Sequence, residues 1–197
     1  MRNRFVALAA LVGLAFASPA LAGHHLWTTS EIFSNSSGTI QYIELFCPAA
    51  GEPNLGAFGV TASSHTFNFV TNLPSSATAN TWVLIATTAY AATPGAVTPD
   101  YTLPTVAGGF FSPAGGNVVY AGLDNWAYGA VPTDGLHALA RSGATPVNTP
   151  TNFAGQTGTI NVGTALPAFP TWGLILLVGA LLLAASGLIR KREVSLA

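Results

Sequence analysis

Residues 82–86 read Trp-Val-Leu-Ile-Ala, a run in which every position, not every second one, is apolar. Such a run predicts a central β-strand whose two faces are both covered by other parts of the fold. Residues 40–47 read Ile-Gln-Tyr-Ile-Glu-Leu-Phe-Cys and predict a second strand. Alternation places its side chains on two faces: Gln41, Ile43, Leu45 and Cys47 on one, and Ile40, Tyr42, Glu44 and Phe46 on the other.

The same kind of pattern continues on both sides of these two segments. From residue 23 to residue 165, short apolar runs alternate with clusters of Gly, Pro, Asn and Ser, and no stretch has a helical period. The turn Asn35-Ser36-Ser37-Gly38 suits a hairpin. Strands are predicted at Leu26–Phe33, Thr39–Phe46, Phe58–Thr61, His65–Phe69, Trp82–Thr87, Asn117–Tyr120 and Leu136–Arg141. We therefore predict an all-β fold over residues 23–163, an antiparallel β-sandwich of the immunoglobulin-like kind.

Charge is scarce and unevenly distributed. Only 7% of the 197 residues are charged, while 50% are hydrophobic. Between residues 23 and 163 a single basic residue, Arg141, faces six acidic ones, a formal charge of −5, and there is no lysine. Nucleic-acid binding depends on Lys and Arg neutralising phosphates, so this composition excludes a nucleic acid as partner.

The N-terminal 22 residues are typical of a secretory signal peptide. Arg2 and Arg4 form a basic start, Phe5 to Ala17 is apolar, and Ala20-Leu21-Ala22 matches a cleavage site of small residues. The alternative is an uncleaved anchor, but the apolar part is short for a membrane span. We expect the mature chain to begin at Gly23.

Residues 172–189 form an uncharged run of 18 residues near the C-terminus, WGLILLVGALLLAASGLI. At 1.5 Å per residue such a helix is about 27 Å long, close to the hydrocarbon thickness of a bilayer. Trp172 suits the membrane interface, and Arg190, Lys191 and Arg192 form a cytoplasmic basic cluster in the tail 190–197. We predict a transmembrane helix with its N-terminus outside, because the alternative, a buried core helix, would need a polar face.

The segment 164–171 and the span together resemble a C-terminal sorting signal of Gram-negative bacteria. The residues that carry this likeness are Pro167, Pro170, Trp172 and Gly173, the apolar run, and Arg190-Lys191-Arg192. The signal is similar to the IPTL-CTERM type, whose signature reads Ile-Pro-Thr-Leu-Ser-Glu-Trp-Gly, and to the related PEP-CTERM group. The resemblance implies a sorting protease or transpeptidase as partner, followed by surface display or release.

The order of motifs over residues 26–90 resembles a lamin-tail-type domain, an immunoglobulin-like sandwich found in many bacterial surface proteins. The motifs are Ser30-Glu31-Ile32-Phe33, Gln41-Tyr42-Ile43-Glu44-Leu45, the segment 58–69, and Trp82-Val83-Leu84-Ile85. Residues 91–163 would add further strands and loops to that core, and 164–171 would link it to the span.

Few residues suggest catalysis. Glu44 is expected to accept a hydrogen bond from a backbone or loop donor, because a lone carboxylate has no partner for acid–base work. Cys47 is the only cysteine and is expected to be buried, with an intermolecular thiol as the alternative. Asp134-Gly135 suggests a tight turn, and a calcium site assembled from Asp100, Asp124 and Asp134 is a second alternative.

A sharper metal hypothesis concerns the mature N-terminus. Cleavage after Ala22 would leave Gly23, His24 and His25 with a free amine, two amides and an imidazole in third position. These four nitrogens form a square-planar set suited to Cu(II) or Ni(II). The alternative is an ordinary polar pair leading into a strand, and no other cofactor is expected.

Taken together, these features predict an exported, non-catalytic structural or interaction protein of a Gram-negative envelope. It would be anchored in the cytoplasmic membrane with its sandwich outside, or be processed to the surface or the extracellular space. Its partners would be the membrane, the sorting enzyme and a surface ligand or protein. The alternatives are a metal-binding envelope protein and an extracytoplasmic enzyme.

Overall fold

The computed structural model describes residues 23–163, and strands make up almost all of its regular structure. The strands are β1 (Thr28–Ser34), β2 (Gln41–Cys47), β3 (Gly59–Ala62), β4 (His65–Asn68), β5 (Thr81–Thr87), β6 (Tyr101–Leu103), β7 (Gly116–Tyr120), β8 (Asp124–Tyr128) and β9 (Leu139–Ala140). One short helix, α2, runs from Thr88 to Ala91. All seven predicted strands are present, which confirms the all-β prediction.

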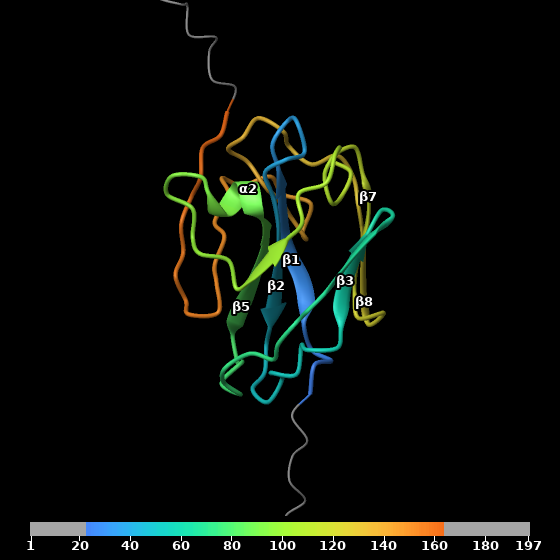
Figure 1. Ribbon diagram of the computed structural model, residues 1–197, viewed down its shortest axis with the longest axis vertical. Helices are drawn as coiled ribbons and strands as arrows, with labels where there is room; N and C mark the ends of the chain where they lie inside the picture. The colour runs from blue at the N-terminus through green and yellow to red at the C-terminus, as the bar shows by residue number, and fades with distance from the viewer. Residues whose placement is uncertain (1–22, 164–197) are drawn as a thin grey trace, which may run out of the picture. The chain divides into compact units, whose positions relative to one another are not determined.

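The strands form two sheets. One has the order β6-β5-β2-β1-β9 and the other β4-β3-β7-β8. Figure 1 shows the two sheets side by side along the long axis of the described domain. The predicted turn at 35–38 joins β1 to β2, with Gly38 at a φ of +71° and its amide bonded to the Asn35 carbonyl at 3.1 Å.

One strand pair corrects the prediction of a purely antiparallel fold. β6 lies parallel to β5, whereas the other strand pairs of residues 23–163 are antiparallel. A parallel neighbour needs a crossover connection of a dozen or more residues. Here α2 and the loop after it make that crossover between Thr87 and Tyr101.

The main core lies between the two sheets. Ile43 and Leu45 of β2 and Val83 and Ile85 of β5 point into it, opposite residues of the second sheet such as Val118 of β7. A second apolar cluster covers the outer face of the first sheet and contains Phe33, Tyr42, Leu84, Ala86 and Tyr90. β2 and β5 are therefore covered on both faces, which confirms the prediction made for the apolar run 82–86 of β5.

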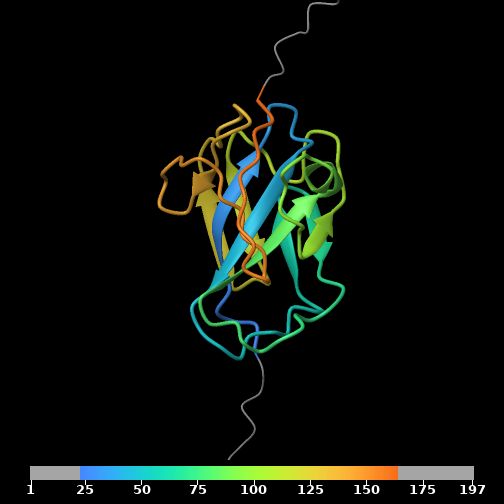
Figure 2. The same cartoon turned by 90° about the vertical axis from the view of Figure 1, so that its left-hand side faces the viewer.

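The outer face is covered by α2 and by residues 147–162, which we call the strap. Figure 2 shows the strap, in orange, crossing in front of the first sheet. Ile160 is buried in the outer cluster, and Val162 packs against it. The Asn148 side chain joins the two ends of the strap, because it donates to the Ile160 carbonyl and accepts from the Ile160 amide. It also donates to the Leu136 carbonyl in the loop before β9.

Within residues 23–163 no helix has the length and apolar character needed to span a membrane. The predicted signal peptide 1–22, linker 164–171, span 172–189 and basic tail 190–197 lie outside the described residues.

Candidate functional site

A row of three carboxylates lies under the strap on the outer face of the first sheet. Glu31 and Glu44 are 7% and 5% exposed, and Asp100 is half-buried. Their donors are backbone amides of alternate strap residues: Thr149 to Glu31 at 3.2 Å, Thr151 to Glu44 at 2.8 Å and Phe153 to Asp100 at 2.9 Å. Because an extended chain repeats every two residues, one side of the strap can present all three amides to the row.

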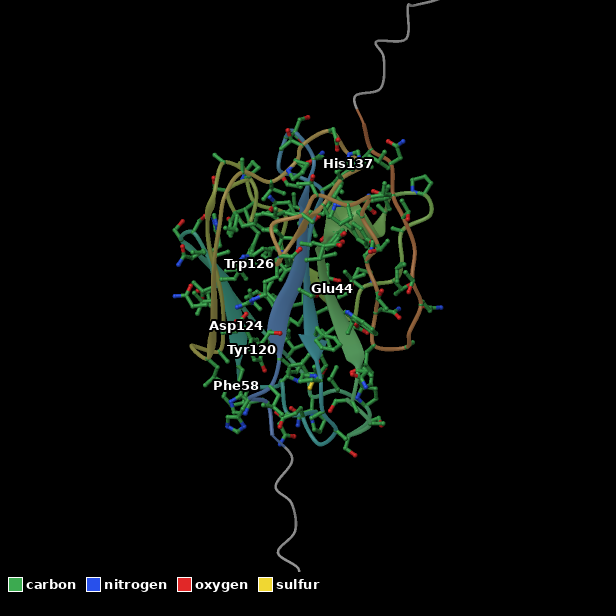
Figure 3. The ribbon with its side chains drawn as sticks, turned by 180° about the vertical axis from the view of Figure 1, so that it is seen from behind. Glu44, Phe58, Tyr120, Asp124, Trp126 and His137 are labelled. Carbon is green, nitrogen blue, oxygen red and sulfur yellow. The ribbon has the colours of Figure 1, made fainter. Side chains whose placement is uncertain are left out.

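Strand register explains why the carboxylates are aligned. Glu31 of β1 is paired with Glu44 of β2, and Glu44 is paired with Leu84 of β5. The Leu84 amide in turn donates to Asp100 at 2.8 Å. The row therefore crosses three neighbouring strands at one level, and Figure 3 shows Glu44 at the middle of the sheet.

Glu44 is hydrogen-bonded at both oxygens. The Ser30 hydroxyl lies 2.7 Å from Oε1, and the Thr151 amide lies 2.8 Å from Oε2. This confirms the prediction that Glu44 accepts from a loop donor. Burial raises the pKa of Glu44 to about 7, against the hydrogen bonds from Ser30 and Thr151, which lower it.

The neighbouring acids show the same effect. Burial raises the pKa of Glu31, although the Tyr42 hydroxyl and the Thr149 amide donate to it. Burial also raises the pKa of Asp100. The pKa of Tyr42 lies well above its usual value, because the hydroxyl is buried and lies beside the Glu31 carboxylate.

Tyr90 of α2 lies against Tyr42, with ring centroids 5.5 Å apart. Its fully buried hydroxyl makes no hydrogen bond of normal geometry within residues 23–163. Burial raises the pKa of Tyr90 to about 12, although the nearby Val97 amide lowers it.

Chemically, two adjacent carboxylates can serve as an acid–base pair. In this structure, however, the amides of the strap occupy Glu31 and Glu44 and cover them from solvent. The arrangement therefore holds the chain's own backbone, and it ties the strap to three strands at once.

A second charged site joins the two sheets. Asp124 at the start of β8 is 7% exposed, and it accepts two hydrogen bonds from Arg141, at 2.7 and 2.8 Å. The Thr29 amide of β1 adds a third at 2.8 Å. Burial raises the pKa of Asp124, but the hydrogen bonds from Arg141 and Thr29 outweigh burial and bring it below its usual value. The Arg141 guanidinium also lies over the Trp126 ring, 5.9 Å from its centroid.

The predicted copper ligands lie at one end of the sandwich, near Phe58 in Figure 3. The His24 ring stacks on Phe58 with centroids 3.4 Å apart and tilts against His25 at 4.1 Å. The Gly23 nitrogen donates to the Gly51 carbonyl at 2.6 Å, and the His25 amide donates to Glu52 at 2.5 Å. Two of the four nitrogens that copper would need are therefore hydrogen-bonded to the protein, and copper binding stays a prediction.

The three aspartates considered for calcium are not brought together. Asp100 binds backbone amides, Asp124 binds Arg141, and Asp134 caps its own turn by accepting from the Leu136 and His137 amides. No group of three His, Cys, Asp or Glu within residues 23–163 is arranged to hold a metal ion. The tight turn at Asp134-Gly135 is confirmed, with Gly135 at a φ of +81°.

Cys47 is fully buried, and its thiol donates to the Ala49 carbonyl at 3.1 Å. Burial raises the pKa of the thiol. The predicted buried cysteine is confirmed. The predicted sorting residues Pro167, Pro170, Trp172, Gly173, Arg190, Lys191 and Arg192 lie beyond the described part of the chain.

Sequence reasoning missed Glu31, Asp100 and the Asp124–Arg141 pair. One signal was available for Glu31, because an acid between polar and apolar strand residues, Ser30 and Ile32, needs a partner when it is buried. For Asp124 the only hint was that Arg141 is the single basic residue between residues 23 and 163. Comparison of the chain with protein-family models, curated proteins and solved structures found no match.

Proposed function

We propose that this chain is an exported, non-catalytic structural or interaction protein of a Gram-negative envelope, held in the cytoplasmic membrane or sorted to the surface through its C-terminus. The signal-like start, the apolar run at 172–189 and the basic tail support export and anchoring.

The observation that carries this proposal is that the two ends of the folded sandwich coincide with the predicted ends of the signal peptide and the linker. Gly23, the predicted first residue of the mature chain, is already hydrogen-bonded into the sandwich. At the other end the described sandwich ends at Gly163, next to the predicted linker 164–171. Figure 1 shows that the described chain enters at one end of the sandwich and leaves at the other. A tether that begins after Gly163 would therefore leave the loops at the Gly23 end farthest from the attachment point.

The way the sandwich uses its polar groups supports a non-catalytic role. The most deeply buried acids, Glu31, Glu44 and Asp124, bind the chain's own backbone or its own arginine. The sparse charge of the domain also suits recognition by shape and hydrogen bonding more than by electrostatic steering.

A lamin-tail-like, immunoglobulin-like topology is part of the proposal. The strands that carry the motifs, β1, β2 and β5, are neighbours in one sheet, and the β3–β4 hairpin belongs to the other. Superposition of an experimental structure on lamin-tail domains tests it, and a different order of these five strands would contradict it.

The anchoring proposal is tested by substitution within the predicted span. Replacing Leu177 with Arg places a charge near the bilayer centre, at a cost of about 2.5–3.5 kcal/mol on insertion scales. We expect the Leu177→Arg protein to leave the membrane fraction of a Gram-negative host, and the matched Leu177→Ile protein to remain in it. Equal membrane partitioning of the two variants would contradict the anchor.

A further inference from the structure

The segment from Gly23 to Trp27 is held by a dense set of hydrogen bonds at the entry end of the sandwich. Besides the Gly23 nitrogen and the His25 amide, its carbonyls are engaged: Asn54 donates to the Gly23 carbonyl at 3.1 Å and the Tyr120 hydroxyl donates to the His24 carbonyl at 2.8 Å. The Trp27 indole donates to the Glu52 carbonyl at 2.7 Å. All of these partners except Tyr120 of β7 belong to the loop 51–54.

Glu52 is the charged member of this set. It is 9% exposed, and no Lys, Arg or His side chain of residues 23–163 forms an ion pair with it. Its Oε2 accepts the His25 amide at 2.5 Å and the Leu26 amide at 3.4 Å, while Oε1 accepts no hydrogen bond within those residues. Glu52 acts on the nearby His24 and raises the pKa of its imidazole, but burial and His25 lower that pKa by more. A cation in contact with the carboxylate would offset the cost of burying its charge.

The same carboxylate lies close to the Cα of Gly23. A Cβ at Gly23 would lie 2.6 Å from Glu52 Oε1 and 2.9 Å from Oε2, so the carboxylate would have to shift to make room for it. The nitrogen of Gly23 is bonded to the same Cα, about 2.5 Å from that Cβ position by standard bond lengths and angles. Glu52 Oε1 therefore lies no more than about 5 Å from the Gly23 nitrogen.

We propose that Glu52 and the Gly51 carbonyl form a docking site for the free α-ammonium group of Gly23. The inference rests on the proposed export. Hydrolysis of the Ala22–Gly23 bond adds the hydroxyl of water to the Ala22 carbonyl carbon and leaves the amine, protonated at neutral pH, on Gly23. The amide of the uncut chain has one N–H, which the Gly51 carbonyl accepts. The ammonium has three N–H groups and a positive charge, which can pair with the negative charge of Glu52. The docked ammonium also withholds from copper the nitrogens of the metal site predicted for Gly23, His24 and His25.

Residues 23–163 contain no lysine, so after cleavage the α-amine of Gly23 and, in a chain that keeps its tail, the side chain of Lys191 are the amines to be labelled, and mass spectrometry of the N-terminal peptide reports Gly23 alone. The full chain is exported in a Gram-negative host and purified, and its N-terminus is determined by mass spectrometry. An amine-reactive acetyl ester at neutral pH then labels the α-amine, with the free peptide Gly-His-His as an internal reference. We expect an N-terminal Gly23 that reacts about tenfold or more slowly in the native than in the denatured protein, as one hydrogen bond to a charged group provides.

The protection should disappear in Glu52→Gln and be partly kept in Glu52→Asp, while Asp134→Asn, an exposed carboxylate in another turn, should leave it unchanged. If Glu52→Gln does not fold, the native and denatured wild-type proteins and Glu52→Asp decide the question. A Gly23 amine that labels equally fast in both states would overturn the docking site and leave export intact. A recovered chain that still begins at Met1 would overturn the cleavage and the docking site together.

Discussion

Glu44 shows how a single buried carboxylate makes stability depend on pH. Its pKa is raised to about 7 in the folded protein, against an ordinary value of 4.5. A raised folded pKa means that protonation favours the folded state. The contribution of Glu44 is therefore fully present below about pH 4.5 and is lost as the pH rises through 7. The protonated form is well accommodated, because the Ser30 hydroxyl can accept from Oε1 while it donates to the Glu44 carbonyl 3.2 Å away.

Glu44→Gln should remove this dependence. The amide keeps the acceptor for Thr151 and offers an N–H to Ser30, so it imitates the protonated acid. We expect the free energy of unfolding of Glu44→Gln to approach that of the wild type at about pH 4 and below. At pH 8 it should exceed the wild type by up to about 3 kcal/mol. Urea unfolding at the two pH values measures the difference.

Asp134→Asn provides a control of opposite sign. Hydrogen bonds from the His137 and Leu136 amides lower the pKa of Asp134 to about 2, so its contribution is present above the ordinary pKa and is lost as the pH falls through 2. At pH 8 Asp134→Asn should therefore not raise the free energy of unfolding as Glu44→Gln is expected to do. A Glu44→Gln protein less stable than the wild type at pH 8 would contradict the assigned cause.

Substitution of Arg141 should also lower the free energy of unfolding. Arg141→Ala leaves Asp124 buried without its cation and removes two charge-assisted hydrogen bonds. We expect a loss of about 2 kcal/mol in the free energy of unfolding. Arg141→Lys should lose less, because it keeps the charge but not the paired geometry. An unchanged urea midpoint for Arg141→Ala would show that the pair does not join the sheets energetically.

The residue scale also shows where sequence reasoning stops. The role of Glu44 could be predicted because an acid in an apolar strand must find a donor. The identity of the donor could not be predicted, because Thr151 lies 107 residues from Glu44 in the sequence. The donor to Glu31, Thr149, is likewise 118 residues away. The strap has no periodic apolar pattern to mark it, so its contacts emerge only from the folded chain.

At the scale of elements, the apolar runs predicted the strands best. β2 and β5 could be predicted from their apolar composition, whereas β6 has three residues and was not predicted. β8 could have been found, since Asp-Asn-Trp-Ala-Tyr alternates and its residues are alternately buried and exposed. The short α2 has no helical period to reveal it, and it forms where the chain must cross over to place β6 parallel to β5.

The strap is the element whose removal should be most informative. Asn148 is fully buried and bonds to Leu136 at 2.6 Å and to the Ile160 carbonyl and amide at 2.7 and 2.9 Å. Asn148→Ala leaves the carbonyl and amide of Ile160 without these partners, whereas the Leu136 carbonyl keeps its hydrogen bond from the backbone amide of residue 148 at 3.0 Å, so we expect a cost of about 3 kcal/mol. We expect the strap amides, including those of Thr149 and Thr151, to exchange with deuterium faster while the β2 amides remain protected.

Asn161→Ala is the matched control within the strap. Asn161 makes only a local hydrogen bond, to the Gly163 amide, in an exposed position. Its substitution should leave exchange unchanged. Uniformly faster exchange over both sheets in Asn148→Ala would contradict the view that the strap opens as a separate unit.

At the scale of the whole molecule, the chain combines a folded sandwich, residues 23–163, with two terminal segments whose roles are predicted from the sequence. The central claim is that the chain is exported, cut before Gly23 and held by its C-terminus. The most direct test is the intact mass of the protein recovered from each cell fraction of a Gram-negative host. We predict an envelope or extracellular protein that begins at Gly23, either extending to Ala197 or ending near residues 167–172. A soluble cytoplasmic protein that retains both Met1 and Ala197 would contradict the claim.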